Sequence, residues 1–115
     1  MNKIQSKISI KKQATLRDIQ DYVLEMEKER GFSDNSVIEE CLMLGEEVGE
    51  LFKSIRKNQN LTIDQNSKFA STKEELADIL IFLCAIANRL DIDLEKSLRD
   101  KEDINKNRSW LKKDH

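Results

Sequence analysis

The chain has 115 residues, of which 37% are charged and 38% are hydrophobic, and its formal net charge is −2. Both signs of charge are mixed along the chain, so no extended basic surface for nucleic acid is predicted. The longest apolar run, residues 79–87, is far shorter than the roughly 20 residues of a membrane span. The first residues are basic and polar and lack the apolar stretch of a signal peptide. We therefore expect one cytoplasmic domain that binds neither membrane nor nucleic acid.

Reactive side chains are few, which limits the chemistry open to this protein. The only histidine is His115, at the end of the chain, and the two cysteines, Cys41 and Cys84, lie within apolar helical patterns. A Ser/His/Asp or Cys/His mechanism needs a well-placed imidazole, and two cysteines alone cannot form a structural zinc site. Both cysteines are expected to be buried free thiols. Catalysis, if there is any, must use carboxylates and lysines.

The sequence has no proline and only three glycines, so little interrupts a helix. Apolar residues spaced three and four apart predict four helices, over residues 15–30, 37–58, 72–89 and 94–110. Suitable capping residues stand at the expected starts: Thr15, Ser36, either Ser71 or Thr72, and Asp93. The connector over residues 60–69 is polar and shows no strand pattern. We expect an all-α four-helix domain over residues 14–110, with flexible segments at 1–13 and 111–115.

The third expected helix indicates an oligomer. Residues 79–87 are apolar on every side of a helix, and a helix of this kind is normally buried on every side. A four-helix monomer of this size can hardly enclose one, so a homodimer or homotetramer is predicted. Gly45 and Gly49, on or beside the apolar stripe of the second helix, fit a close approach between helices.

Acidic residues border the apolar faces of two helices. Glu47 and Glu50 lie one turn apart on the second helix, and Glu75 and Asp78 share a face at the start of the third. Buried carboxylates are costly and either take up protons or bind cations. Oxygen ligands without histidine or cysteine suit Mg²⁺ or Mn²⁺. The spacing alone leaves two interpretations open, a metal site and a solvated acidic face favoured by helix dipoles.

The acids stand in a recognisable context. The segments LGEEVGEL (residues 44–51), KEELADILIFL (73–83) and LDIDLEKSLRDKEDINKNRSW (90–110) resemble the MazG-like nucleotide pyrophosphohydrolases of the all-α NTP pyrophosphatase superfamily. The resemblance covers most of the chain, from about residue 30 to residue 110. It implies an oligomeric four-helix fold and a Mg²⁺-dependent enzyme, with Mn²⁺ as the alternative metal. The implied reaction cleaves a nucleoside triphosphate between the α and β phosphates, giving a monophosphate and pyrophosphate in nucleotide-pool housekeeping.

The resemblance also implies roles for individual residues. It makes metal ligands of Glu47, Glu50, Glu75 and Asp78, and makes Glu46 a further ligand or the base for the attacking water, so that Glu46 and Glu47 are the catalytic candidates. The phosphate-contacting group would be Lys101, Asn105 and Arg108, which fall on one face of the fourth helix; a solvated basic face is the alternative. Phe32 and Trp110 are candidates for contact with the base, although a lone aromatic residue is more often part of a core or an interface.

A second function from another class is a non-catalytic helical oligomerisation or interaction module. It would explain the bundle and the apolar helix but not the paired acids. The two functions differ in metal dependence, because only a metal-phosphate site predicts stabilisation by Mg²⁺.

Overall fold

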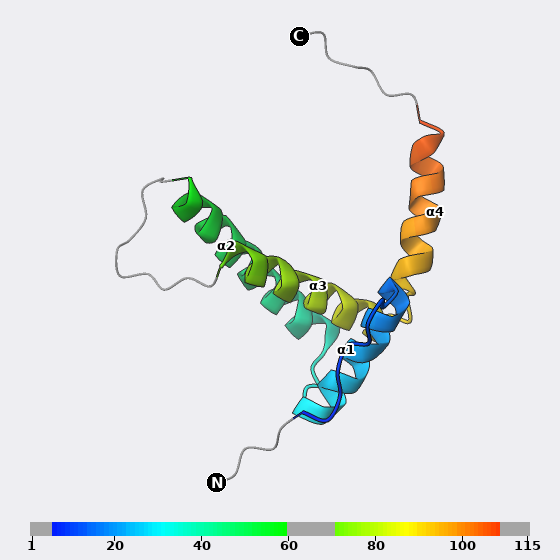
Figure 1. Cartoon of the computed structure of the whole chain (residues 1–115), viewed down its shortest axis with the longest axis horizontal. Coiled ribbons are helices and arrows are strands. Elements are labelled where there is room, and N and C mark those ends of the chain that lie inside the picture. Colours follow the sequence, from blue (N-terminus) through cyan, green and yellow to red (C-terminus); the bar gives the residue numbers. More distant parts are fainter. Residues whose placement is uncertain (1–5, 60–70, 109–115) are drawn as a thin grey trace.

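The structure, a computed structural model, describes residues 6–59 and 71–108. This part of the chain forms four helices and no strand: α1 (Leu16–Arg30), α2 (Val37–Asn58), α3 (Thr72–Arg89) and α4 (Leu94–Lys106). α2 and α3 run antiparallel and pack along each other, α1 packs against α3, and α4 packs against α1 (Figure 1). The predicted all-α four-helix class is confirmed.

The starts of the helices are set by N-capping residues. The Thr15 hydroxyl accepts a hydrogen bond from the Asp18 amide at 3.1 Å, and the Asp18 carboxylate accepts one from the Thr15 amide at 2.9 Å. Ser71 and Glu74 form the same reciprocal box at the start of α3, which satisfies amides that have no partner within the helix. Gly31 ends α1 with a φ of 79°, a left-handed conformation that glycine adopts at little cost.

The fourth helix is shorter than predicted. It ends at Lys106, and Arg108 lies beyond it. The side chain of Asn107 donates a hydrogen bond to the Asp103 carbonyl at 3.1 Å, and asparagine side chains that bond to the backbone in this way compete with the continuation of a helix. The predicted extension to Trp110 and the segment 111–115 lie outside the described residues.

A small core joins α1 and α3. Its buried members are Val23, Met26, Cys84 and Ala85, and the partly buried residues packed against it include Ile8 and Ile81. Ile8 belongs to the segment before α1, so part of that segment packs on the core. The prediction for the cysteines is right for Cys84 and wrong for Cys41, which is exposed. Cys41 shares its helix face with Ile38 and Leu42, and none of the other three helices described covers this face.

A buried glutamine fixes the turn between α3 and α4. Gln20 is 1% exposed, and its amide nitrogen donates to the Asn88 side chain at 3.0 Å and to the Ile92 carbonyl at 2.6 Å. Its amide oxygen accepts from the Leu94 amide at 3.0 Å. Since the Leu94 amide is the first of α4, this glutamine sets where α4 begins relative to α1.

Large apolar side chains on α2 and α3 are exposed to solvent. Ile38 and Leu42 on α2 are 72% and 71% exposed, and Leu76 on α3 is 54% exposed. A Cβ atom added to Gly45 or Gly49 would meet nothing within 4 Å, so the close helix approach predicted at these glycines does not occur between the described helices. Among the described residues, no helix is both long enough and apolar enough to cross a bilayer.

Candidate active site

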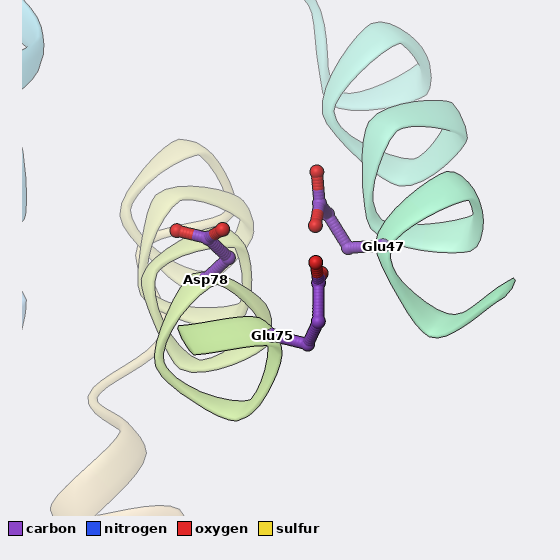
Figure 2. A group of neighbouring side chains, drawn as sticks. All are labelled: Glu47, Glu75 and Asp78. Atoms are coloured by element: carbon purple, nitrogen blue, oxygen red, sulfur yellow. The ribbon is translucent and has the colours of Figure 1, made fainter. Parts of the chain in front are cut away.

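Three of the predicted acids meet between α2 and α3. Glu47 extends from the middle of α2, while Glu75 and Asp78 extend from the first two turns of α3 (Figure 2). One carboxylate oxygen from each residue lies within 4.8 Å of the others. The i,i+3 spacing of Glu75 and Asp78 places both on the face of α3 that is turned toward Glu47.

The electrostatics of these acids are unfavourable without a cation. Glu75 is 4% exposed, and its buried Oε2 atom has no hydrogen-bond partner in the described part of the chain. Hydrogen bonding to Glu75, followed by burial and the charges of nearby acids, raises the pKa of Glu47 to about 7. Burial, followed by the charges of Glu75 and Glu74, raises the pKa of Asp78. Among residues 6–59 and 71–108, every charged neighbour that shifts these two pKa values is another carboxylate.

This donor set fits a hard divalent cation. Several carboxylate oxygens converge, one of them buried and without a partner, and such groups require positive charge or protons. Mg²⁺ and Mn²⁺ favour oxygen ligands of this kind. Of the other two predicted acids, Glu50 is partly buried but lies outside the group of three, and Glu46 is exposed. The ligand role of Glu50 and the base role of Glu46 stay predictions.

A pocket adjoins the acids. Its volume is about 180 Å³, and Asp78 belongs both to its lining and to the acid group. The lining is largely apolar, with Met26, Met43, Ile81, Phe82 and Ala85, and the α1–α2 loop adds Phe32 and Asn35. Phe32 was predicted to contact a base, and it is 47% exposed at this pocket. Trp110, the other aromatic candidate, lies outside the described residues.

Sequence reasoning missed a buried ion cluster at the same pocket. Arg89, in the last turn of α3, binds both oxygens of Glu27 at 2.9 and 2.6 Å and lies 3.4 Å from Glu40. Glu27 and Glu40 are 4% and 3% exposed, and both line the pocket. Hydrogen bonding to Glu27 is the main cause that raises the pKa of Arg89. The sequence contained one indication that Glu27 is buried: Glu27 follows Val23 by one helical turn and therefore lies on the apolar face of α1.

The predicted phosphate-binding residues do not reach the acids within one chain. Lys101 and Asn105 lie on α4, which leaves the far end of α3 and extends away from the α2–α3 pair (Figure 1). Glu75 lies in the first turn of α3, about 20 Å of helix rise before that end. Arg108, placed beyond the end of α4, follows Lys101 and Asn105 rather than completing a helical face with them.

Comparison with known proteins defines the class. A family model described as the MazG nucleotide pyrophosphohydrolase domain matches residues 35–108. Two crystal structures of iMazG from Vibrio DAT 722 resemble the chain with a TM-score of 0.59 each. The C-terminally tagged form is 33% identical over 81% of this chain and 99% of its own, and the N-terminally tagged form is 34% identical over 83% and 100%. No protein of curated function matches the chain.

Fold, acid cluster and sequence similarity agree. The chain belongs to the MazG nucleotide pyrophosphohydrolase family. It is therefore an all-α hydrolase that acts on nucleoside triphosphates, and the resemblance carried by its acidic segments is confirmed.

Proposed function

We propose that the chain hydrolyses a nucleoside triphosphate between the α and β phosphates, with Mg²⁺ held by Glu47, Glu75 and Asp78 and completed by Glu50. The observation that carries the proposal is that, in the described part of the chain, the buried Oε2 of Glu75 has no hydrogen-bond partner and the charged groups that shift the pKa values of Glu47 and Asp78 are all acids. Bound Mg²⁺ would neutralise charge on the phosphates and on the acids together.

The proposed reaction needs a base for the attacking water. Water attacks the α phosphorus, the bond to the bridging oxygen breaks, and pyrophosphate leaves with the bonding electron pair. The proton of the water goes to a carboxylate, for which Glu46 and Glu47 are the candidates.

The pocket beside Asp78 is the proposed site for the base. Its volume of about 180 Å³ is below the roughly 300–1,000 Å³ of pockets that hold a whole drug-sized ligand. It therefore fits only part of a nucleotide, and its apolar lining suits a planar heterocycle rather than phosphate. Phe32 supplies an aromatic face at this pocket.

A second copy of the chain is proposed to complete the site. The apolar faces of α2 and α3, with Ile38, Leu42 and Leu76 open to solvent, support a homodimer or homotetramer. Since α4 lies away from the acids of its own chain, we assign the phosphate contacts to Lys101, Asn105 and Arg108 of a neighbouring copy. Light scattering at micromolar protein should give more than the 13.4 kDa of one chain; a monomeric mass would contradict the assembly.

Subunit mixing tests whether the site is shared. Lys101→Ala removes a phosphate contact, and Glu75→Gln removes a metal ligand, so each protein alone should be nearly inactive. When the two are mixed and allowed to exchange subunits, some sites combine an intact α4 with intact acids, and activity should return. A mixture that stays inactive after exchange would place Lys101 and the acids of one site in the same chain, and a Lys101→Ala protein that is active alone would exclude Lys101 from the site.

The primary test is pyrophosphate release from canonical and modified nucleoside triphosphates, each measured with Mg²⁺, with Mn²⁺ and with EDTA. Equal amounts of monophosphate and pyrophosphate, formed only with metal, are expected. Release of inorganic phosphate instead would contradict α–β cleavage. No release, together with no thermal stabilisation by Mg²⁺, would leave the interaction module as the function.

A further inference from the structure

The loop between α1 and α2, residues 31–36, is held by one arginine of α3. The Nε atom of Arg89 donates to the Asn35 carbonyl at 2.7 Å, and its Nη2 atom donates to the Phe32 carbonyl at 2.9 Å. The loop is otherwise tied to α1 by the Phe32 amide, which donates to the Glu27 carbonyl at 2.8 Å. The loop therefore cannot move away from α3 without breaking two hydrogen bonds to a charged donor.

The same guanidinium is fixed from the other side. Glu27 accepts from both terminal nitrogens of Arg89 at 2.9 and 2.6 Å, and the Ala85 carbonyl accepts from Nη1 at 3.0 Å. With the two loop carbonyls this makes five hydrogen bonds, which use every N–H of an arginine side chain. The Arg89 side chain is 12% exposed. Arg89 therefore has no N–H group left to donate to a substrate, so any effect of Arg89 on the reaction must act through the residues that it binds.

The loop residues that Arg89 binds form one wall of the pocket. Phe32 and Asn35 line the pocket together with Asp78, and Asn35 also donates from its side chain to Glu40 at 3.1 Å. We propose that Arg89 is a positioning residue for nucleotide binding, which fixes the 31–36 loop so that Phe32 lies against the base in the pocket beside Asp78. This inference rests on the proposed function, and it adds a residue that contacts no substrate.

Arg89→Lys is the first test. Lysine keeps the positive charge between Glu27 and Glu40, but a single ammonium group cannot reproduce the planar fork that spans both carbonyls. We expect KM for the preferred nucleoside triphosphate to rise by about fivefold or more while kcat changes by less than about twofold, since the affected contact binds the base and not the reacting phosphates. Hydrolysis of ribose 5-triphosphate, which has no base, should keep the wild-type kcat/KM.

A matched control separates positioning from lost stability. Val23→Ala removes buried volume from the core, where Val23 is 1% exposed and does not line the pocket. It should lower the unfolding temperature as Arg89→Lys does, yet leave KM at the wild-type value. A similar KM increase in Val23→Ala would show that instability alone raises KM, and would overturn the inference.

Phe32→Ala tests the route of the effect. If Arg89 acts through Phe32, the two substitutions are coupled, and Arg89→Lys should raise KM by less than about twofold in the Phe32→Ala background. If the KM increases of the two substitutions multiply in the double variant, the proposed route is overturned.

Gly31→Ala disturbs the same loop independently of Arg89. Gly31 has a φ of 79°, a conformation that strains a residue with a side chain, although an added Cβ would meet no other atom. The substitution should also raise KM for the nucleotide without changing hydrolysis of ribose 5-triphosphate.

Failure of the inference and failure of the proposed function give different results. If the wild-type protein releases pyrophosphate but KM is unchanged in both Arg89→Lys and Gly31→Ala, only the positioning role is overturned. If the wild-type protein hydrolyses no nucleoside triphosphate, the proposed function fails first. Should Arg89→Lys show no cooperative unfolding transition, Gly31→Ala tests the step on which the inference depends, that the loop position controls KM, and an unchanged KM in that variant would overturn the inference.

Discussion

Two groups of carboxylates, each with at least one buried member, lie at or beside the same pocket, and they differ in one respect. Glu27 and Glu40 enclose a cation, Arg89, at distances of 2.6 to 3.4 Å. Glu47, Glu75 and Asp78 have oxygens that lie within 4.8 Å of one another, and no ion pair joins them to a lysine or arginine among residues 6–59 and 71–108. The first group therefore has its charge partner within the described part of the chain, whereas the second has none there.

The difference shows how to tell a structural acid from a functional one. Burial does not distinguish Glu75 from Glu27 and Glu40, because all three are 3–4% exposed. What distinguishes them is whether the oxygens have partners: both oxygens of Glu27 do, and one oxygen of Glu75 does not. A carboxylate that folding leaves unpaired destabilises the metal-free protein and favours binding of a cation.

The largest predicted effect comes from making the first group resemble the second. Arg89→Met keeps much of the side-chain volume but leaves Glu27 and Glu40 buried without a cation. Removing one partner of a buried ion pair typically costs about 3–5 kcal/mol, and urea unfolding should show a loss of that size. A control, Arg99→Met, removes an exposed arginine whose nearest carboxylate contact is 4.0 Å, and should cost less than about 1 kcal/mol. Equal losses in the two variants would contradict the structural role of the Arg89 cluster.

The reverse change makes the second group resemble the first. Asp78→Lys places a cation beside Glu47 and Glu75, so in EDTA the unfolding free energy should rise, by about 1 kcal/mol. The same ammonium occupies the position of the metal, so pyrophosphate release should fall by at least about a hundredfold, since metal catalysis contributes several kcal/mol. Asp78→Asn, the control, should lose activity with a smaller gain in stability. Retained activity in Asp78→Lys would remove Asp78 from the metal site.

Much of the fold could be predicted because its signals are local. Thr15, Ser36 and Asp93 are the N-caps that the sequence indicated, and Ser71 is one of the two candidates for the cap of α3. The first three helices end at the predicted residues. The end of α4 was missed because Asn107 stops the helix by a side-chain hydrogen bond in a stretch that contains neither glycine nor proline. The local sequence therefore predicts where the helices begin better than it predicts where α4 ends.

The candidate site could be predicted only in part, for a tertiary reason. Glu47, Glu75 and Asp78 border apolar faces of their helices, and the structure brings them together. Glu27 and Glu40 border apolar faces in the same way, but nothing in their spacing indicates that Arg89, 62 residues after Glu27, would reach both. Lys101 looked like a member of the site, yet α4 leaves the bundle in another direction. Which acids have partners is decided by how the helices pack.

A smaller effect is expected in the pH dependence of the metal-free protein. The pKa of Glu47 is raised from 4.5 to about 7 in the folded state, so between these values the folded protein binds more protons than the unfolded one. Stability in EDTA should therefore fall as pH rises from about 4.5 to 7. The raised pKa of Asp78 acts in the same direction.

Unfolding temperatures measured across this range in wild type and in Glu47→Gln provide the check. The variant should show a shallower decline, because it lacks the main titrating group. Mg²⁺ competes with the protons, so its stabilising effect on the wild type should increase with pH. Identical pH profiles for the two proteins in EDTA would exclude Glu47 as the group responsible.

The smallest predicted effect concerns the cap of the acid-bearing helix. Ser71 accepts from the Glu74 amide at 3.3 Å and caps the turn of α3 that carries Glu75. Ser71→Ala should cost about 1 kcal/mol of stability, and, because the first turn then frays, the Mg²⁺ concentration for half-maximal activity should rise a few-fold. Thr15→Ala removes an equivalent capping box from α1, away from the acids, so it should cost similar stability without changing the Mg²⁺ requirement. If both variants shift the Mg²⁺ requirement equally, the effect reflects global stability, and if neither does, the first turn of α3 keeps Glu75 in place without its cap.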